Sequence, residues 1–326
     1  PGFYYCQPLT VMLLPGYSII RLRKPLGEGK DMQSWWQLFI QGCLILLLIA
    51  GGVVAWTGEV PPRQLAHRAI YRSAVMYTSW QTRNWLETES AHFCLRYRPE
   101  DSEVARLVLD NAEAAYLPAA ELLQYRPKGK SLLVLHPDRA SLAREFGWTA
   151  SESAMGVYWN GVIRLLSPQD WVYSQDLEEI KRVFSSIGPM VHEYTHLLVD
   201  CKARGNYPRW LTEGIAQYVE RQLIGFTMPA PAEITAWYPL ARMDRGFDSL
   251  PDQSLAYYQS LVLVDYLEQR WGWEAVLQLL ERLGQGDSLE QACRQILSVS
   301  LQEFEAMFNK AADLERQGRQ KAAACF

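Results

Sequence analysis

Cysteine and histidine are scarce in this chain, and charge of neither sign prevails. Six cysteines occur among 326 residues without a C-x-x-C pair, which argues against a zinc ribbon or a dithiol redox motif. The 32 Lys and Arg residues and the 36 Asp and Glu residues give a net charge of −4 with no basic stripe, so nucleic acid is not an expected partner. No internal repeat is present. The length suits one domain of about 230 residues with appendages.

One stretch has no charged side chain, from Met32 to Gly58. It exceeds the roughly 20 residues that a bilayer core requires, and tryptophans near both ends fit an aromatic belt. We therefore predict a transmembrane anchor over residues 32–58. A signal peptide cleaved near Val53-Val54-Ala55 is the alternative. Either would place the following domain outside the cytoplasm, on the cell membrane or secreted.

Proline, glycine and composition divide the rest of the chain. Residues 1–31 mix apolar and basic residues, and Met32 is a candidate for the true start. The expected segments are a poorly ordered start (1–31), the anchor or signal sequence (32–58), a helical stalk (59–87), one domain (88–317) and a Gln/Lys/Ala-rich tail (318–326). A disulfide is left open among Cys94, Cys201, Cys293 and Cys325.

Two of the five histidines stand in the motif H-E-x-x-H, at His192 and His196. Residues four apart overlie one another on a helix, so both imidazoles can reach one metal ion, while Glu193 borders the same pocket. This geometry suits zinc with an open coordination position. A surface helix with two solvated histidines is the alternative.

The segment Pro208–Ala216 adds a second motif, W-L-x-E-G-x-A, seventeen positions from His196 to Glu213. The two motifs together resemble the gluzincin metallopeptidases, and within them the peptidase MA-like group of bacterial domains, over about residues 88–310. The resemblance implies that Glu213 is the third ligand of one zinc ion beside the two imidazoles. It also implies that Glu193 is the general base.

The patterning predicts an α+β domain with a small mixed sheet. Alternating or apolar segments predict strands at 92–97, 131–136, 155–159 and 162–166, and the last two flank Asn160-Gly161, a strong hairpin signal. The resemblance to gluzincins implies a sheet edge above the pair of zinc-binding helices that pairs with substrate, and this hairpin is the candidate for that edge; it could also simply close the sheet. Apolar spacing predicts helices throughout residues 252–317, after a long loop at 224–250.

Three further side chains are candidates for the same site. Tyr257, in Tyr257-Tyr258-Gln259-Ser260, matches a tyrosine of the MA-like domains and could donate to an oxyanion, or it could be a core tyrosine. Asp200 and Gln217 are each one helical turn from a predicted ligand and could orient it, or they could simply be solvated.

The sequence thus predicts a membrane-anchored zinc metallopeptidase that hydrolyses peptide bonds. Its expected partners are a peptide or protein substrate and the membrane, through the N-terminal helix. A catalytically inert zinc domain that binds peptide or cell-wall material is the alternative. The intact Glu193 argues against it, since binding alone needs no base.

Overall fold

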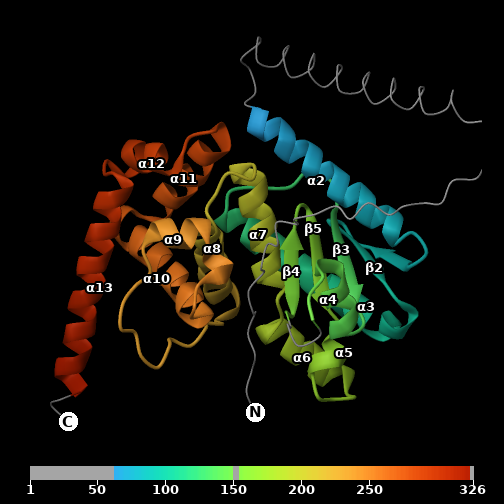
Figure 1. Cartoon of the computed structure of the whole chain (residues 1–326). Coiled ribbons are helices and arrows are strands. Elements are labelled where there is room, and N and C mark those ends of the chain that lie inside the picture. The colour runs from blue at the N-terminus through green and yellow to red at the C-terminus, as the bar shows by residue number, and fades with distance from the viewer. Residues whose placement is uncertain (1–61, 150–153, 324–326) are drawn as a thin grey trace, which may run out of the picture.

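The computed structural model describes residues 62–149 and 154–323 (Figure 1). The predicted anchor at 32–58 and the segment 1–31 lie outside the described residues, so the structure does not bear on them. Within the described ranges, no helix combines the length and apolar character that crossing a membrane requires.

A five-stranded mixed sheet and the helices that cover it form one side of the described structure (Figure 1). Its strands are β1 (Leu86–Glu89), β2 (Phe93–Tyr97), β3 (Ser131–His136), β4 (Gly156–Trp159) and β5 (Val162–Leu166), in the order β1-β2-β3-β5-β4. The three inner strands are parallel, and β1 and β4 are antiparallel edges. Every residue of β3 is buried, as expected for a parallel strand covered on both faces.

Most of the rest of the described chain is helical. The first set is α2 (Pro62–Gln81), α3 (Ser102–Leu122), α4 (Arg139–Phe146), α5 (Pro168–Trp171), α6 (Leu177–Ile187), α7 (Met190–Ala203) and α8 (Arg209–Ile224). The second set is α9 (Leu240–Arg245), α10 (Gln253–Trp271), α11 (Trp273–Gln285), α12 (Leu289–Ala292) and α13 (Leu301–Ala323). Short single turns, η1 (Pro99–Asp101), η2 (Phe247–Ser249) and η3 (Cys293–Leu297), connect some of them.

Successive side chains of β3 point to opposite faces of the sheet, and each face packs into a different hydrophobic core. Leu133 and Leu135 face the main core, which they share with α3, α7 and the C-terminal helices. Leu132 and Val134 face the opposite way into a small cluster that includes Val75 of α2. The expected stalk helix therefore lies against the domain.

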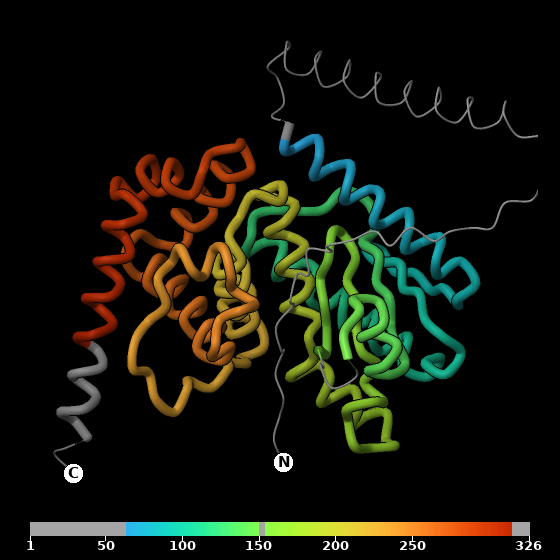
Figure 2. Tube along the Cα trace, in the orientation of Figure 1, coloured from blue at the N-terminus to red at the C-terminus, as the bar shows by residue number. Residues whose placement is uncertain are grey.

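The helix α7 stands between the sheet and the C-terminal helices, and Figure 2 shows α13 on the outer side of these helices, away from the sheet. In α8, Gly214 permits a close helix crossing, because a Cβ there would lie 2.1 Å from the backbone oxygen of Ser260 in α10. The mixed α+β fold with a helical C-terminal part agrees with the sequence-based prediction.

The predicted hairpin is present, and both of its turn residues have positive φ, 45° at Asn160 and 88° at Gly161. Three elements of the sheet and helices were missed: β1 straddles the end of the expected stalk at residue 87, α5 follows the hairpin, and α9 lies inside the expected loop. Cys94, Cys201 and Cys293 are free, and Cys325 lies outside the described residues.

Candidate metal centre

The helix α7 carries the H-E-x-x-H motif into the interior. It starts after Pro189, and all but two of its fourteen residues are buried, because the sheet covers it on one side and α8 on another. The rings of His192 and His196 lie edge to face with centroids 4.7 Å apart, as their one-turn spacing predicts.

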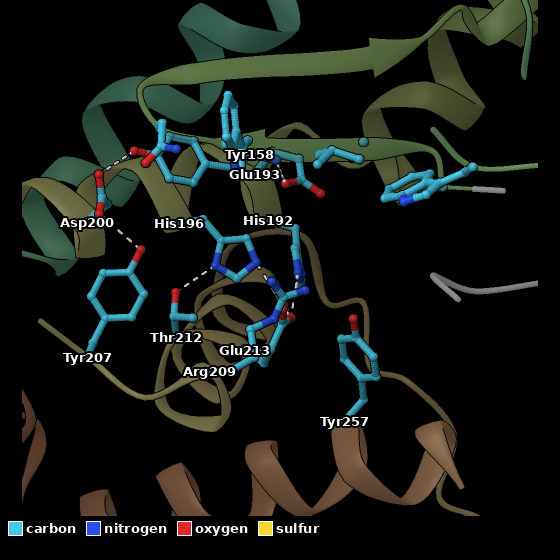
Figure 3. A pocket seen from close by; sticks show the side chains of 16 residues that line it. Tyr158, His192, Glu193, His196, Asp200, Tyr207, Arg209, Thr212, Glu213 and Tyr257 are labelled. Carbon is cyan, nitrogen blue, oxygen red and sulfur yellow. Dashed lines mark hydrogen bonds and ion pairs between the residues drawn. The ribbon is translucent and has the colours of Figure 1, made fainter. Parts of the chain in front are cut away.

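The helix α8 brings Glu213 to the same two imidazoles (Figure 3). Its Oε2 lies 3.4 Å from Nε2 of His192 and 3.5 Å from Nε2 of His196. These separations exceed the 2.7–3.2 Å or so of a good hydrogen bond. They match the roughly 3.3–3.4 Å between neighbouring ligands of tetrahedral zinc, when each bond is about 2.0–2.1 Å.

Burial of the carboxylate supports the same interpretation. Glu213 is 2% exposed, and its Oε2 has no hydrogen-bond partner within the described part of the chain. One ligand atom from each of the three residues lies within 4.8 Å of the others. A divalent cation would satisfy this orphaned oxygen, so the donor set fits zinc.

Outer contacts hold both imidazoles by their Nδ1 atoms. Nδ1 of His196 lies 2.7 Å from Thr212 Oγ1, and Nδ1 of His192 lies 3.2 Å from Glu220 Oε2. When the proton of the imidazole is on Nδ1, the lone pair of Nε2 points to the candidate metal position between His192, His196 and Glu213.

These contacts correct the prediction for Asp200 and Gln217. Asp200 binds other groups, and Gln217 donates to the backbone oxygens of Glu213 and Tyr257 instead of orienting a ligand side chain. The residues that sequence reasoning missed are Thr212 and Glu220. Glu220 stands two turns after Glu213 on the same helix, which is the one signal that could have indicated it.

The electrostatics favour an ionised Glu213. Burial raises the pKa of its carboxyl, but the charges of Arg209 and His196 outweigh burial and hold that pKa well below its usual range. Arg209 Nε lies 2.7 Å from Glu213 Oε1, whereas the imidazoles approach Oε2. Burial lowers the pKa of His192, yet the carboxylates of Glu213 and Glu220 raise it well above its usual range.

Glu193 lies beside the ligand group without joining it. Its Oε2 accepts a hydrogen bond from the backbone N–H of Tyr158, at 2.6 Å. The edge strand comes so close that a Cβ at Gly156 would lie 2.7 Å from Cγ of Glu193. Burial raises the pKa of Glu193, against the opposing effect of the two imidazoles, which suits a group that must take up a proton.

A cavity of about 160 Å³ opens over these groups, between β4 and α10. Figure 3 shows the phenol of Tyr257 rising from α10 toward Glu213 and His192. Tyr257 is 4% exposed, and its phenol is close enough to the guanidinium of Arg209 to contribute to raising the pKa of that arginine well above its usual value. The structure therefore brings Tyr257 to the site that the sequence suggested.

An H-E-x-x-H helix, a glutamate from the following helix and a sheet edge above them form the arrangement that the resemblance to gluzincin metallopeptidases predicted. Residues 181–311 match the family model of the Peptidase MA superfamily, 131 of the 326 residues. The match includes both motifs and Tyr257, and it confirms the resemblance for this part of the chain. No curated protein gives a significant match to the chain.

Proposed function

We propose that this chain is a zinc-dependent metallopeptidase that hydrolyses peptide bonds. The convergence of His192, His196 and Glu213, with Glu193 adjacent but outside the group, is the observation that supports the proposal most strongly. When bound, a zinc ion supplies Lewis acidity at that position and lowers the pKa of a water there.

The side chains around the metal position have separate roles in this proposal. Glu193 takes a proton from the attacking water and passes it to the leaving amine, as a carboxylate of raised pKa can do. Tyr257 lines the cavity over the metal position, where its O–H can donate to the developing oxyanion. Thr212 and Glu220 keep the imidazoles oriented.

The edge strand β4 is suited to hold an extended peptide. Outward and inward backbone groups alternate along an antiparallel strand, and the N–H of Tyr158 faces Glu193 and so faces away from β5. Gly156 shares this orientation, and without a side chain it leaves room between β4 and α7. A substrate backbone that pairs with β4 would cross the metal position.

The run at 32–58 places this activity, in our proposal, on the outer face of the cytoplasmic membrane. Substrates would then be exported or surface proteins and peptides. Release after signal cleavage is the other outcome that the sequence allows.

Zinc content and peptide cleavage measured on one preparation test the proposed function. We expect one zinc per chain and turnover of a diverse peptide library that a chelator abolishes and added zinc restores. A chain that holds one zinc and cleaves no peptide would instead support an inert zinc-containing binding domain.

A further inference from the structure

A buried carboxylate, Asp200, joins three parts of the fold beside the candidate metal centre. Figure 3 shows it with Tyr207 on one side of the imidazoles, opposite Tyr257. Asp200 is 4% exposed and accepts hydrogen bonds from the hydroxyls of Tyr158, at 2.6 Å, and Tyr207, at 3.0 Å. Both of its oxygens also lie 3.0 Å from Nε2 of His67. One side chain of α7 thus binds the edge strand β4, the turn before α8, and the helix α2.

Tyr158 connects this carboxylate to Glu193. Its hydroxyl donates to Asp200 and accepts from the N–H of Gly161, at 3.0 Å, while its own backbone N–H donates to Glu193. Burial and the charge of Asp200 raise the pKa of Tyr158 well above its usual value, so the phenol stays a donor. Anchoring the phenol therefore fixes the place of the peptide N–H that binds the carboxylate of Glu193.

The helix α2 packs directly on the two turns that border this network. A Cβ at Gly161, in the hairpin turn, would lie 2.5 Å from the ring of Tyr71. A Cβ at Gly205, in the turn between α7 and α8, would lie 2.4 Å from the ring of His67. Both glycines have positive φ, 88° and 72°. Two rings one turn apart on α2 thus occupy the space that side chains at these turns would need.

We propose that α2 is a positioning element of the candidate catalytic centre, in which His67 and Asp200 hold Tyr158 and thereby the carboxylate of Glu193. The consequence for catalysis rests on the proposed function, whereas the positioning itself does not. Since α2 begins at Pro62, four residues after the predicted anchor ends at Gly58, it also ties the base to the segment that would tether the chain. Neither His67 nor Asp200 touches the reacting atoms.

Substitutions of His67 in the full chain test the proposal. His67→Phe keeps a ring against Gly205 and removes the donor to Asp200, while His67→Gln keeps a donor. Met76→Ala is the matched control, since Met76 is on the same helix and is 72% exposed. The readouts are amide hydrogen exchange of peptides that contain β4, zinc content and the kinetics of peptide cleavage.

Loss of a hydrogen bond to a charged group should accelerate exchange of the Tyr158 amide about tenfold or more in His67→Phe. His67→Gln should recover part of this protection, and Met76→Ala should match the parent. We also expect kcat to fall in His67→Phe while KM and zinc content stay near those of the parent. Because kcat reports the base and KM the binding of the peptide, a split of this kind marks a positioning role.

Two results would overturn the proposal. The first is amide exchange of β4 that is unchanged in His67→Phe while α2 stays protected. The second is equal acceleration of amide exchange in every strand, which would indicate general destabilisation. Failure of the proposed function is distinguishable. A parent chain that cleaves no peptide refutes the peptidase, while β4 exchange still decides the role of α2. An active parent with β4 exchange insensitive to His67 refutes the positioning role alone.

Discussion

At the scale of single residues, Glu193 allows the base to be separated from the metal, because it borders the ligand group without contributing to it. Glu193→Gln keeps the size of the side chain and removes the base. Peptide cleavage should fall by about a hundred- to ten-thousand-fold, the usual contribution of a general base, while bound zinc stays near one per chain. His192→Ala should lose both zinc and activity. A Gln variant that cleaves as fast as the parent would show that Glu193 is not the base.

The hydroxyl of Thr212 should contribute to metal affinity without touching the ion, because it holds Nδ1 of His196 at 2.7 Å. Thr212→Val removes the hydroxyl that accepts from Nδ1 of His196 and keeps the shape of the side chain. Loss of such an outer partner typically lowers metal affinity about 10–100-fold, which competition with a zinc chelator measures. Thr212→Ser keeps the hydroxyl and should bind zinc like the parent; equal weakening in both variants would point to packing instead.

His136, which is not one of the candidate ligands, should make the stability of the fold sensitive to acid. It is 1% exposed, and neither ring nitrogen has a hydrogen-bond partner among the described residues. Burial, assisted by the charge of Arg164, lowers its pKa to about 3. Below about pH 6.5 the unfolded chain takes up a proton at this histidine and the folded chain does not, so stability falls as pH decreases toward 3.

The pH effect of His136 should be visible in denaturant titrations between pH 7 and 4. The parent should lose up to about 1.4 kcal/mol of unfolding free energy per pH unit more than His136→Gln, which cannot take up that proton. Parallel curves for the two proteins would show that His136 is protonated equally well in both states.

The four residues of the main motifs were predictable from sequence, since the spacing of His192, Glu193 and His196 follows from one helical turn and Glu213 from a family resemblance. Their supporting contacts were not. Which side chain reaches a given Nδ1 depends on how α8 packs on α7, and no local pattern encodes that packing. For this reason Asp200 was a candidate to orient a ligand, although in the structure it binds His67 of α2 and Tyr158 of β4.

At the scale of elements, the close crossing of α8 and α10 should be the most sensitive helix contact near the site. Gly214→Ala raises intrinsic helix propensity by about 1 kcal/mol, but its Cβ would collide with the backbone of Ser260. Overpacking of this kind typically costs about 1–3 kcal/mol, so the unfolding free energy should fall in denaturant titrations. Increased stability in the variant would mean that α8 and α10 can move apart far enough to accept the new Cβ without a cost in packing.

Elements with strong local signals were predicted almost to the residue. β3 is a short apolar run, and the hairpin turn needs the positive φ of Asn160 and Gly161. The strand β1 was not predicted, because its LETE sequence is polar and mostly exposed and is a strand only through pairing with β2. The place of α2 on the sheet was also beyond the sequence, which shows a helix but not its docking surface.

At the scale of the whole molecule, the expected topology has a direct test. If the run at 32–58 crosses the cytoplasmic membrane, the domain from residue 88 onward should be degraded by protease added to intact cells or spheroplasts. Residues before Met32 should be protected when they are present. A domain that protease reaches only after lysis would contradict the extracytoplasmic assignment and leave the chemistry of the site untouched.

The docking of α2 also sets an order of events during synthesis of the chain. Gln64 of α2 donates to the backbone oxygen of Gly284, and His67 binds Asp200, partners that lie 220 and 133 positions later. At about 5–20 residues per second, a ribosome needs on the order of ten to forty seconds to make the longer interval. For the first part of that time α2 can pack only on the sheet, through Val75, because Asp200 and Gly284 have not yet been made. The nascent chain therefore carries an incompletely docked α2 for most of the synthesis of the domain, and α11 must be made before the last of these contacts can form.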